Sequence, residues 1–306
     1  MNNLRILIVS QKGGVGKSTL SANLAAWFSE IDTQSTVLVD LDPHGSSSSW
    51  LKNARDCGAK YEHFVTNTFS ERRWLIDARN KIRKYLPSSK VVICDLTWTA
   101  AMDSEFMHEF DLVVVPTSVS SIELNATIKF LENIKWVFEA RDGIPPSLLL
   151  CPSRVLDEQL NDDPFSSENF PISFMLLPPI LDDIEIRKYF KESFIYDNSN
   201  LSATAFKKCA ESIKQAGEIH KKTAQEIKLS FANRRVIDRH NTKLSRFMSQ
   251  KSSDIQPVNN ANSVNFGNRT KRNLMSDKKV SISNKSPSPG KVSGLMKILT
   301  SALVNK

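Results

Sequence analysis

Short apolar runs recur along the first two thirds of the chain, rich in Leu and β-branched residues and without alternating polar positions. Runs of this kind are typical of strands buried on both faces, as in a parallel sheet covered by helices. The predicted strands lie at residues 4–9, 37–39, 91–94, 112–115, 148–151 and 172–176.

Stretches with helical periodicity separate these strands, at residues 18–31, about 70–85, 122–141 and 183–191. Strands that alternate with helices indicate βαβ units. The predicted fold class is therefore α/β, a doubly wound and mainly parallel sheet flanked by helices.

A longer helical pattern follows, from residue 201 to about residue 235, and it predicts one long helix or two in series. Its apolar positions are spaced by three, four or seven residues. They are Phe206, Ala210, Ile213, Gly217, Ala224, Ile227 and Phe231.

The composition changes beyond residue 246. Residues 250–293 are rich in Ser, Asn, Lys and Pro and too poor in apolar side chains to offset the entropy of ordering, so we predict a disordered linker. Residues 294–306 become apolar again, with Leu295, Ile298 and Leu299 spaced for one face of a helix. The predicted organisation is a domain at 1–230, a basic helical extension at 231–249, the linker, and a short amphipathic segment at 294–306.

The net charge of +8 is unevenly distributed. Residues 1–206 carry 20 Lys and Arg against 27 Asp and Glu, whereas residues 207–306 carry 21 against 6. A basic C-terminal third favours a polyanionic partner, either nucleic acid or an acidic membrane surface.

Five basic residues recur every seven positions in the long helical pattern, so they form a slowly curving stripe along a helix. This basic stripe is either a surface that follows DNA phosphates or a solvated flank whose lysine stems cover the edge of the core. It consists of Lys207, Lys214, Lys221, Lys228 and Arg235.

Several features favour a cytoplasmic protein. No run approaches the ~18 apolar residues of a membrane-spanning helix, and the first residues lack a secretory pattern. The four cysteines are scattered without CxxC spacing, which is typical of buried, reduced thiols.

Residues 10–19, with the sequence SQKGGVGKST, follow a predicted strand and open a predicted helix, which is the context of a phosphate-binding loop. Glycines permit backbone angles and close approach that a Cβ would block. Successive N–H groups then form a nest for phosphate oxygens at a helix N-terminus. We expect Lys17 to reach the β- and γ-phosphates and the Ser18 hydroxyl to ligate Mg²⁺. The predicted ligands are ATP and Mg²⁺, and the predicted nucleotide contacts are Gly13, Gly14, Val15, Gly16, Lys17, Ser18 and Thr19.

The string KGGVGKST at residues 12–19 resembles the deviant Walker A motif of the ParA/MinD family of partitioning and positioning ATPases. Gln11 stands where an ordinary loop has Gly, and Lys12 adds a second lysine. The string VLVDLDP at 37–43 is similar to the family's second motif, and VVICD at 91–95 resembles its Walker B strand. The resemblance covers about residues 4–225.

This resemblance implies roles for individual residues. Lys12 reaches across a nucleotide-sandwich homodimer to the partner's ATP, Asp42 orients or activates the attacking water, and Asp95 holds Mg²⁺ through a water. Asp40 either supports the metal or caps a turn. The predicted catalytic residues are thus Lys12, Lys17 and Asp42, and the predicted metal site is Ser18, Asp42 and Asp95.

The chain also departs from the family pattern. His44 replaces the usual Gln after the second motif, residues 96–98 (LTW) follow the Walker B aspartate, and Ser153 precedes Arg154 where Asn is expected. These departures concern the hydrolysis rate and recognition of the base more than ATP binding.

The sequence thus predicts a ParA-like ATPase that dimerises on ATP, binds DNA non-specifically and positions or partitions a DNA element or other cargo. Slow turnover stimulated by an adaptor protein and a nucleoid-associated location in the cytoplasm are expected. One alternative is a MinD-like positioning ATPase at the membrane periphery, attached through residues 294–306. Another is a non-hydrolysing, nucleotide-dependent adaptor in DNA transfer.

Overall fold

The computed structural model describes residues 3–31, 35–65, 72–140, 143–156, 158–159, 164–166, 169–190 and 192–253, without the side chains of Arg72 and of residues 231–253. The chain divides into two units, Met1–Phe247 and Met248–Lys306. The predicted linker beyond residue 253 and the predicted amphipathic segment at 294–306 lie outside the described residues.

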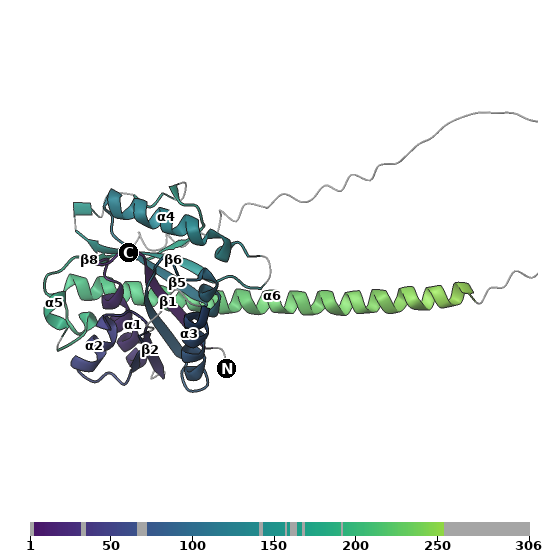
Figure 1. Ribbon diagram of the computed structural model, residues 1–306, viewed down its shortest axis with the longest axis horizontal. Coiled ribbons are helices and arrows are strands. Elements are labelled where there is room, and N and C mark those ends of the chain that lie inside the picture. Colours follow the sequence, from purple (N-terminus) through teal and green to yellow (C-terminus); the bar gives the residue numbers. More distant parts are fainter. Residues whose placement is uncertain are drawn as a thin grey trace, which may run out of the picture. The chain divides into compact units, whose positions relative to one another are not determined.

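The first unit is built on an eight-stranded sheet in the order β3-β2-β4-β1-β5-β6-β7, with β8 paired to β6 (Figure 1). All the strand pairs are parallel. The strands are β1 (Leu4–Ser10), β2 (Thr36–Asp40), β3 (Lys60–His63), β4 (Val91–Thr97), β5 (Leu112–Thr117), β6 (Ser147–Val155), β7 (Met175–Leu176) and β8 (Ile180–Leu181). The predicted fold class is confirmed.

Helices connect the strands and cover the sheet. They are α1 (Lys17–Ile31), α2 (Ser46–Asn53), α3 (Arg72–Tyr85), α4 (Ser121–Phe138), α5 (Ile186–Tyr189) and α6 (Leu201–Ser253), with 3-10 turns η1 (Ser104–Glu109) and η4 (Ile195–Asp197). The pattern predicted as one long helix or two in series is a single helix, α6.

Some predicted bounds were wrong. The strand expected at 172–176 is only β7, and the helix expected at 183–191 is only α5. Ile172 and Phe174 still pack against the core, so their apolar character reports burial and not strand pairing. Neither α2 nor β3 was predicted from the sequence, because α2 opens with four serines and β3 is a polar strand at the edge of the sheet.

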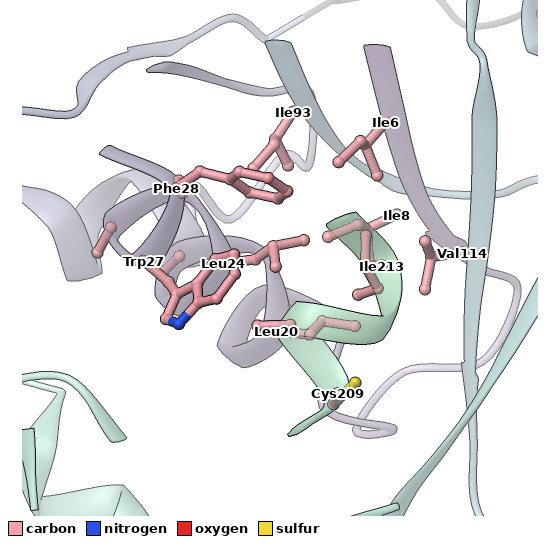
Figure 2. Packing of buried hydrophobic residues seen from close by; sticks show 14 of the residues in the cluster. Ile6, Ile8, Leu20, Leu24, Trp27, Phe28, Ile93, Val114, Cys209 and Ile213 are labelled. Carbon is pink, nitrogen blue, oxygen red and sulfur yellow. The ribbon is translucent and has the colours of Figure 1, made fainter. Parts of the chain in front are cut away.

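The two faces of the sheet bury alternate residues of the same strands. Ile6 and Ile8 of β1 point into one cluster, which α1 and α6 complete with side chains such as Leu24 and Ile213 (Figure 2). Leu7 and its odd-numbered neighbours face the other cluster, built with α3, η1 and α4. Burial on both faces explains why the strands read as continuous apolar runs.

Helix α6 approaches the start of β1 closely at one point. A Cβ placed on Gly217 would lie 2.8 Å from both methyl carbons of Leu4. The buried side of α6 includes Phe206, Cys209 and Ala216, whereas the positions from 221 to 230 are half-buried or exposed. The apolar stripe therefore contacts the core over its first half, while Phe231 lies beyond the described side chains.

All four cysteines are free thiols. Cys94, Cys151 and Cys209 are buried, as predicted, whereas Cys57 is half-buried. None of the helices in the described part of the chain combines the length and apolar character needed to cross a bilayer.

Candidate functional site

The loop between β1 and α1 forms the base of the site. Gly14 and Gly16 adopt φ angles of 80° and 85°, values that glycine reaches without strain. Among the described residues, no backbone carbonyl or side chain accepts a hydrogen bond from the N–H groups of residues 12–16. These donors therefore remain available at the N-terminus of α1, an arrangement that binds anions.

A segment of β6 packs directly against this loop. A Cβ on Gly16 would lie 2.6 Å from Ser153 Oγ, and the positive φ of this residue independently favours glycine. Arg154 donates a hydrogen bond from Nη1 to the Gly14 carbonyl oxygen at 3.1 Å. The serine that replaces the expected Asn thus lies against the loop itself.

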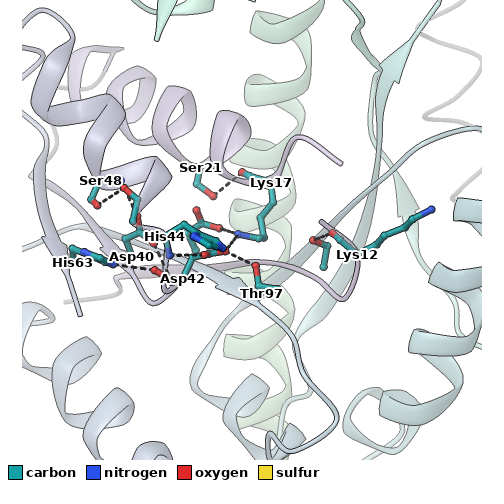
Figure 3. A network of polar contacts seen from close by, with 12 residues as sticks. Lys12, Lys17, Ser21, Asp40, Asp42, His44, Ser48, His63 and Thr97 are labelled. Atoms are coloured by element: carbon teal, nitrogen blue, oxygen red, sulfur yellow. Dashed lines mark hydrogen bonds and ion pairs between the residues drawn. The ribbon is translucent and has the colours of Figure 1, made fainter. Parts of the chain in front are cut away.

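Lys17 lies beneath the loop between two carboxylates (Figure 3). Its Nζ is 2.7 Å from Asp95 Oδ1 and 2.9 Å from Asp42 Oδ2. Burial disfavours the ammonium charge, but the two carboxylates outweigh burial and raise the pKa of Lys17. Lys17 is therefore charged and fixed in place.

The Asp42 carboxylate accepts hydrogen bonds at both of its oxygens. Oδ2 accepts from Lys17 and from the Thr97 hydroxyl, and Oδ1 accepts from the His44 backbone N–H at 3.0 Å. Burial raises the pKa of Asp42, but the hydrogen bonds from Thr97, Lys17 and His44 dominate and lower it to about 2. Asp42 is thus an ionised carboxylate held in one orientation.

Asp40 braces the loop that carries Asp42. Its Oδ1 accepts from the Asp42 N–H at 3.1 Å and its Oδ2 accepts from the Ser48 N–H at 2.9 Å. The side chain is fully buried. Of the two roles expected for Asp40, this geometry supports the cap of a turn.

Asp95 keeps one oxygen open. Oδ1 binds Lys17, while Oδ2 has no hydrogen-bond partner of ordinary geometry among the described residues. The Ser47 hydroxyl also lacks a hydrogen-bond partner of ordinary geometry. It lies close enough to Asp95 to favour the ionised form of that side chain. Complete burial has the largest effect and raises the pKa of Asp95. The positive charge of Lys17 lowers this pKa and the negative charge of Asp40 raises it, so it stays above its ordinary value.

The residues predicted for Mg²⁺ fit a hard cation, because Ser18, Asp42 and Asp95 offer oxygen donors near the open loop. The unpartnered oxygen of Asp95 is the observation that supports this fit. Groups of three or more His, Cys, Asp or Glu arranged around a metal position do not occur in the described ranges. Phosphate oxygens and water would therefore complete the ligand shell, as is usual for Mg²⁺.

Lys12, the second lysine of the loop, lies in different surroundings. It points away from the Lys17 cluster (Figure 3), and its Nζ is 3.4 Å from Glu123 Oε1 in the first turn of α4. The Lys12 side chain is 44% exposed, against 7% for Lys17. The structure thus brings Lys17, Asp42 and Asp95 together and leaves Lys12 outside this group.

The basic stripe lies on α6. Lys207 and Lys228 are exposed, and Lys214 and Lys221 are half-buried. Burial lowers the pKa of Lys221, although Asp111 and Glu218 partly oppose this effect. The side chain of Arg235 lies outside the described residues.

Three residues of the site were not predicted as contributors. Thr97 binds Asp42, Glu123 binds Lys12, and His63 binds the Asp42 carbonyl. Thr97 follows the Walker B aspartate by two positions on the same strand, so alternation along β4 could have indicated it. No sequence signal identifies Glu123 or His63, because their partners are distant in the chain.

Comparison with known proteins agrees with this geometry. Residues 6–274 match the CobQ/CobB/MinD/ParA nucleotide binding domain. The chromosome-partitioning ATPase Soj of Thermus thermophilus is 49% identical over 47 residues, which are 15% of this chain and 18% of that protein. The maintenance of carboxysome distribution protein A of Halothiobacillus neapolitanus is 25% identical over 148 residues, 47% of this chain and 64% of that protein. The chain therefore spans less than two thirds of the length of these relatives.

A solved structure shares the fold. A variant of Cyanothece McdA in complex with ATP superposes with a TM-score of 0.56 at 16% identity, covering 71% of this chain and 96% of that one. The family match extends over most of the chain, and the loop, the two aspartate-bearing strands and the parallel sheet agree with it. The chain belongs to the CobQ/CobB/MinD/ParA family of nucleotide-binding proteins, within which its phosphate loop is of the ParA/MinD kind.

Proposed function

We propose that this protein is a ParA-like ATPase that dimerises on ATP, binds DNA without sequence preference, and positions or partitions a DNA element or other cargo. One observation carries the proposal: a loop of unpaired N–H groups lies between a buried lysine below it and an exposed lysine beside it.

The loop is suited to the phosphates of a nucleotide. The free N–H groups of residues 12–16 and the N-terminus of α1 present positive partial charge to an anion. An ammonium has three N–H donors, and Lys17 uses two of them on Asp42 and Asp95. The third donor is available for a phosphate oxygen without loss of the ion pairs that hold Lys17.

Ser18, Asp42 and Asp95 would hold Mg²⁺, directly or through water. When bound, the ion neutralises charge on the phosphates and on the leaving group. The Ser18 hydroxyl is half-buried in the first turn of α1, next to Lys17. This placement suits a ligand that also contacts the phosphates.

Asp42 is proposed to orient the attacking water. A carboxylate with a lowered pKa is a weak base, so its contribution is orientation and charge more than proton abstraction. Lys12 of a second copy is proposed to stabilise the charge that develops during transfer. Its present partner, Glu123, is half-buried, but the Lys12 side chain is 44% exposed, and ion pairs open to solvent are weak enough to exchange on docking.

The stripe on α6 is proposed to bind DNA phosphates. Lys207 and Lys228 are exposed, so their charges can replace the counterions of DNA phosphates. Lys214 and Lys221 are half-buried and are proposed to contribute less. Binding through phosphates alone gives no sequence preference and a steep dependence on salt.

Soj is named a chromosome-partitioning ATPase, and the second relative is named for maintaining carboxysome distribution. These names support a role in positioning, and the chain's own cargo is proposed only as a DNA element or other assembly. An adaptor that stimulates turnover, and a location at the nucleoid, complete the proposal.

The test is ATP turnover with and without random-sequence DNA, for the wild type and Lys12→Ala. We expect DNA to bind only with ATP present, and turnover to rise with DNA and to be lost in Lys12→Ala. A double charge reversal, Lys207→Glu with Lys228→Glu, should weaken DNA binding and reduce its salt slope by about 2. Lys129→Glu, an exposed lysine of α4, is the matched control.

Other outcomes favour the alternatives. Binding to anionic vesicles that depends on residues 294–306, without DNA binding, would favour a membrane-associated positioning ATPase. ATP binding without turnover, even with DNA, would favour the adaptor. The absence of any affinity for adenine nucleotides with Mg²⁺ would overturn the whole proposal.

A further inference from the structure

The end of β3 lies beside the loop that carries Asp42. In the register of the sheet, His63 of β3 is opposite Asp40 of β2. The Phe64 N–H donates to the Asp40 carbonyl at 2.9 Å, which fixes this pairing to its last residue. The His63 ring is therefore carried to the point where the chain leaves β2 and turns toward α2 (Figure 3).

The ring binds the backbone of Asp42. His63 Nε2 is 2.9 Å from the Asp42 carbonyl oxygen. A carbonyl only accepts, so Nε2 carries the hydrogen and donates it. The same carbonyl also accepts the Gly45 N–H at 3.0 Å. The imidazole thus closes a turn whose first residue is Asp42.

The ring also packs against the other end of this turn. Gly45 has φ +59°, and a Cβ there would lie 2.7–2.9 Å from three atoms of the His63 ring. The Gly45 carbonyl accepts the Ser49 N–H and the Ser48 hydroxyl, both at 2.9 Å, as α2 begins. His63 therefore contacts both ends of the turn, and glycine is the residue that leaves room for it.

Asp42 is consequently fixed by two independent sets of contacts. Its carboxylate is held by Lys17, Thr97 and the His44 N–H. Its main chain is held by Asp40 from one side and by His63 from the other. Only His63 belongs to a strand at the edge of the sheet, and its side chain is exposed.

We infer that His63 is a positioning residue for Asp42: by donating Nε2–H to the Asp42 carbonyl and packing on Gly45, it sets where the carboxylate meets the reacting phosphate. The inference rests on the proposed function, because it takes Asp42 to orient the attacking water. Displacing a catalytic group by about 1 Å lowers a rate by about 100-fold, so a partial loosening of the turn has a measurable effect.

The experiment compares His63→Ala, His63→Gln and Lys60→Ala in the full chain. Alanine at position 63 removes the donor and the ring, and glutamine retains an N–H donor. Lys60, an exposed residue at the start of the same strand, is the control. Two quantities are measured for each variant: kcat and Kd for ATP with Mg²⁺, and the hydrogen-exchange rates of the amides of residues 42–48 without nucleotide.

We expect His63→Ala to lower kcat about tenfold while Kd changes less than about twofold, a loss confined to the reaction step. Exchange at Gly45 and Ser48 should accelerate by a similar factor. His63→Gln should restore most of both effects, and Lys60→Ala should match the wild type. Gly45→Ala should be less harmful in the His63→Ala background than in the wild type, because the clash with the ring is gone.

Wild-type kcat and exchange in His63→Ala would overturn the inference and leave the proposed function intact. Equal damage in His63→Ala and Lys60→Ala would also overturn it. A wild type that binds ATP without turnover would contradict the proposed hydrolysis, and the exchange rates would then decide the positioning role by themselves.

Discussion

The two lysines of the phosphate loop are five residues apart, and they have opposite surroundings. Lys17 has a 7% exposed side chain and lies between two carboxylates at 2.7 and 2.9 Å. Lys12 is 44% exposed and makes one longer contact, at 3.4 Å, with Glu123. One cation belongs to the interior of the subunit and the other to its surface.

The difference indicates that the two lysines have separate roles. A cation held by two buried carboxylates is oriented before any ligand arrives. Binding of a ligand to that cation therefore requires little further ordering of the side chain. A surface cation with one screened partner is free to exchange that partner for a better one. The loop thus combines one lysine that is fixed in the interior with one that can exchange its partner at the surface, as the proposed dimer requires.

The largest effect should follow Lys17→Ala. It leaves Asp42 and Asp95 buried without their common partner, and removing one member of a buried ion pair costs about 3–5 kcal/mol of unfolding free energy. ATP binding should be lost as well. Urea denaturation and nucleotide titration measure both effects. Lys129→Ala, on the exposed face of α4, should stay within about 0.5 kcal/mol of the wild type. Equal stability of the two variants would contradict the buried role of Lys17.

Lys12→Ala should separate turnover from folding. Its loss should change the unfolding free energy by less than about 1 kcal/mol, because Lys12 is 44% exposed and its contact with Glu123 is long, at 3.4 Å. Turnover should fall at least about tenfold, since the charge supplied to the transition state is removed. ATP binding by the monomer should stay near the wild-type value. If Lys12→Ala weakened that binding as much as Lys17→Ala, the division between the lysines would be wrong.

The dependence of the unfolding free energy on pH at acidic pH should report how Asp42 is held. The pKa of Asp42 is lowered from 3.8 to about 2, so its ionised form favours the folded state. This stabilisation is complete above pH 3.8 and is lost as the pH falls through about 2. We expect the unfolding free energies of the wild type and Asp42→Asn to converge over this window by about 1–2 kcal/mol. A constant gap between them from about pH 5 to about pH 2 would show that Asp42 is not held as a carboxylate.

The smallest effect is expected for Glu123→Gln. Removing the charge that holds Lys12 should lower the protein concentration needed for ATP-dependent dimerisation by about twofold, in line with the energy of a surface pair. Stability should be unchanged. Sedimentation velocity with ATP and Mg²⁺ measures the shift, and Glu132→Gln on the same helix is the control. Weaker dimerisation of Glu123→Gln would mean that Glu123 supports the interface.

Much of the fold follows from local signals. The apolar runs predicted β1, β2, β4, β5 and β6 because these strands are buried on both faces, where composition alone identifies a strand. Strand β3 gave no such signal, because an edge strand with a polar face resembles a loop. The runs also gave no information on strand order, which depends on long-range pairing.

The candidate site divides in the same way. The loop and its two aspartate-bearing strands were predictable, because the motif places each residue type at a fixed offset. The roles of Glu123 and His63 could not be predicted, because each contacts a residue that is distant in the sequence and lies outside its own helix or strand. Asp40 shows a further limit: a carboxylate at a strand end has the same sequence signature whether it caps a turn or holds a metal.

The contact between Gly217 and Leu4 has a consequence at both ends of β1. Leu4 begins the strand that ends at the phosphate loop, and Gly217 lies one turn before Lys221 in the basic stripe. A Cβ at position 217 would force the Leu4 side chain to shift. A slip of α6 by one position would bring a side chain against Leu4 and rotate every lysine by about 100°. The glycine therefore favours the rotation at which the helix presents its charges.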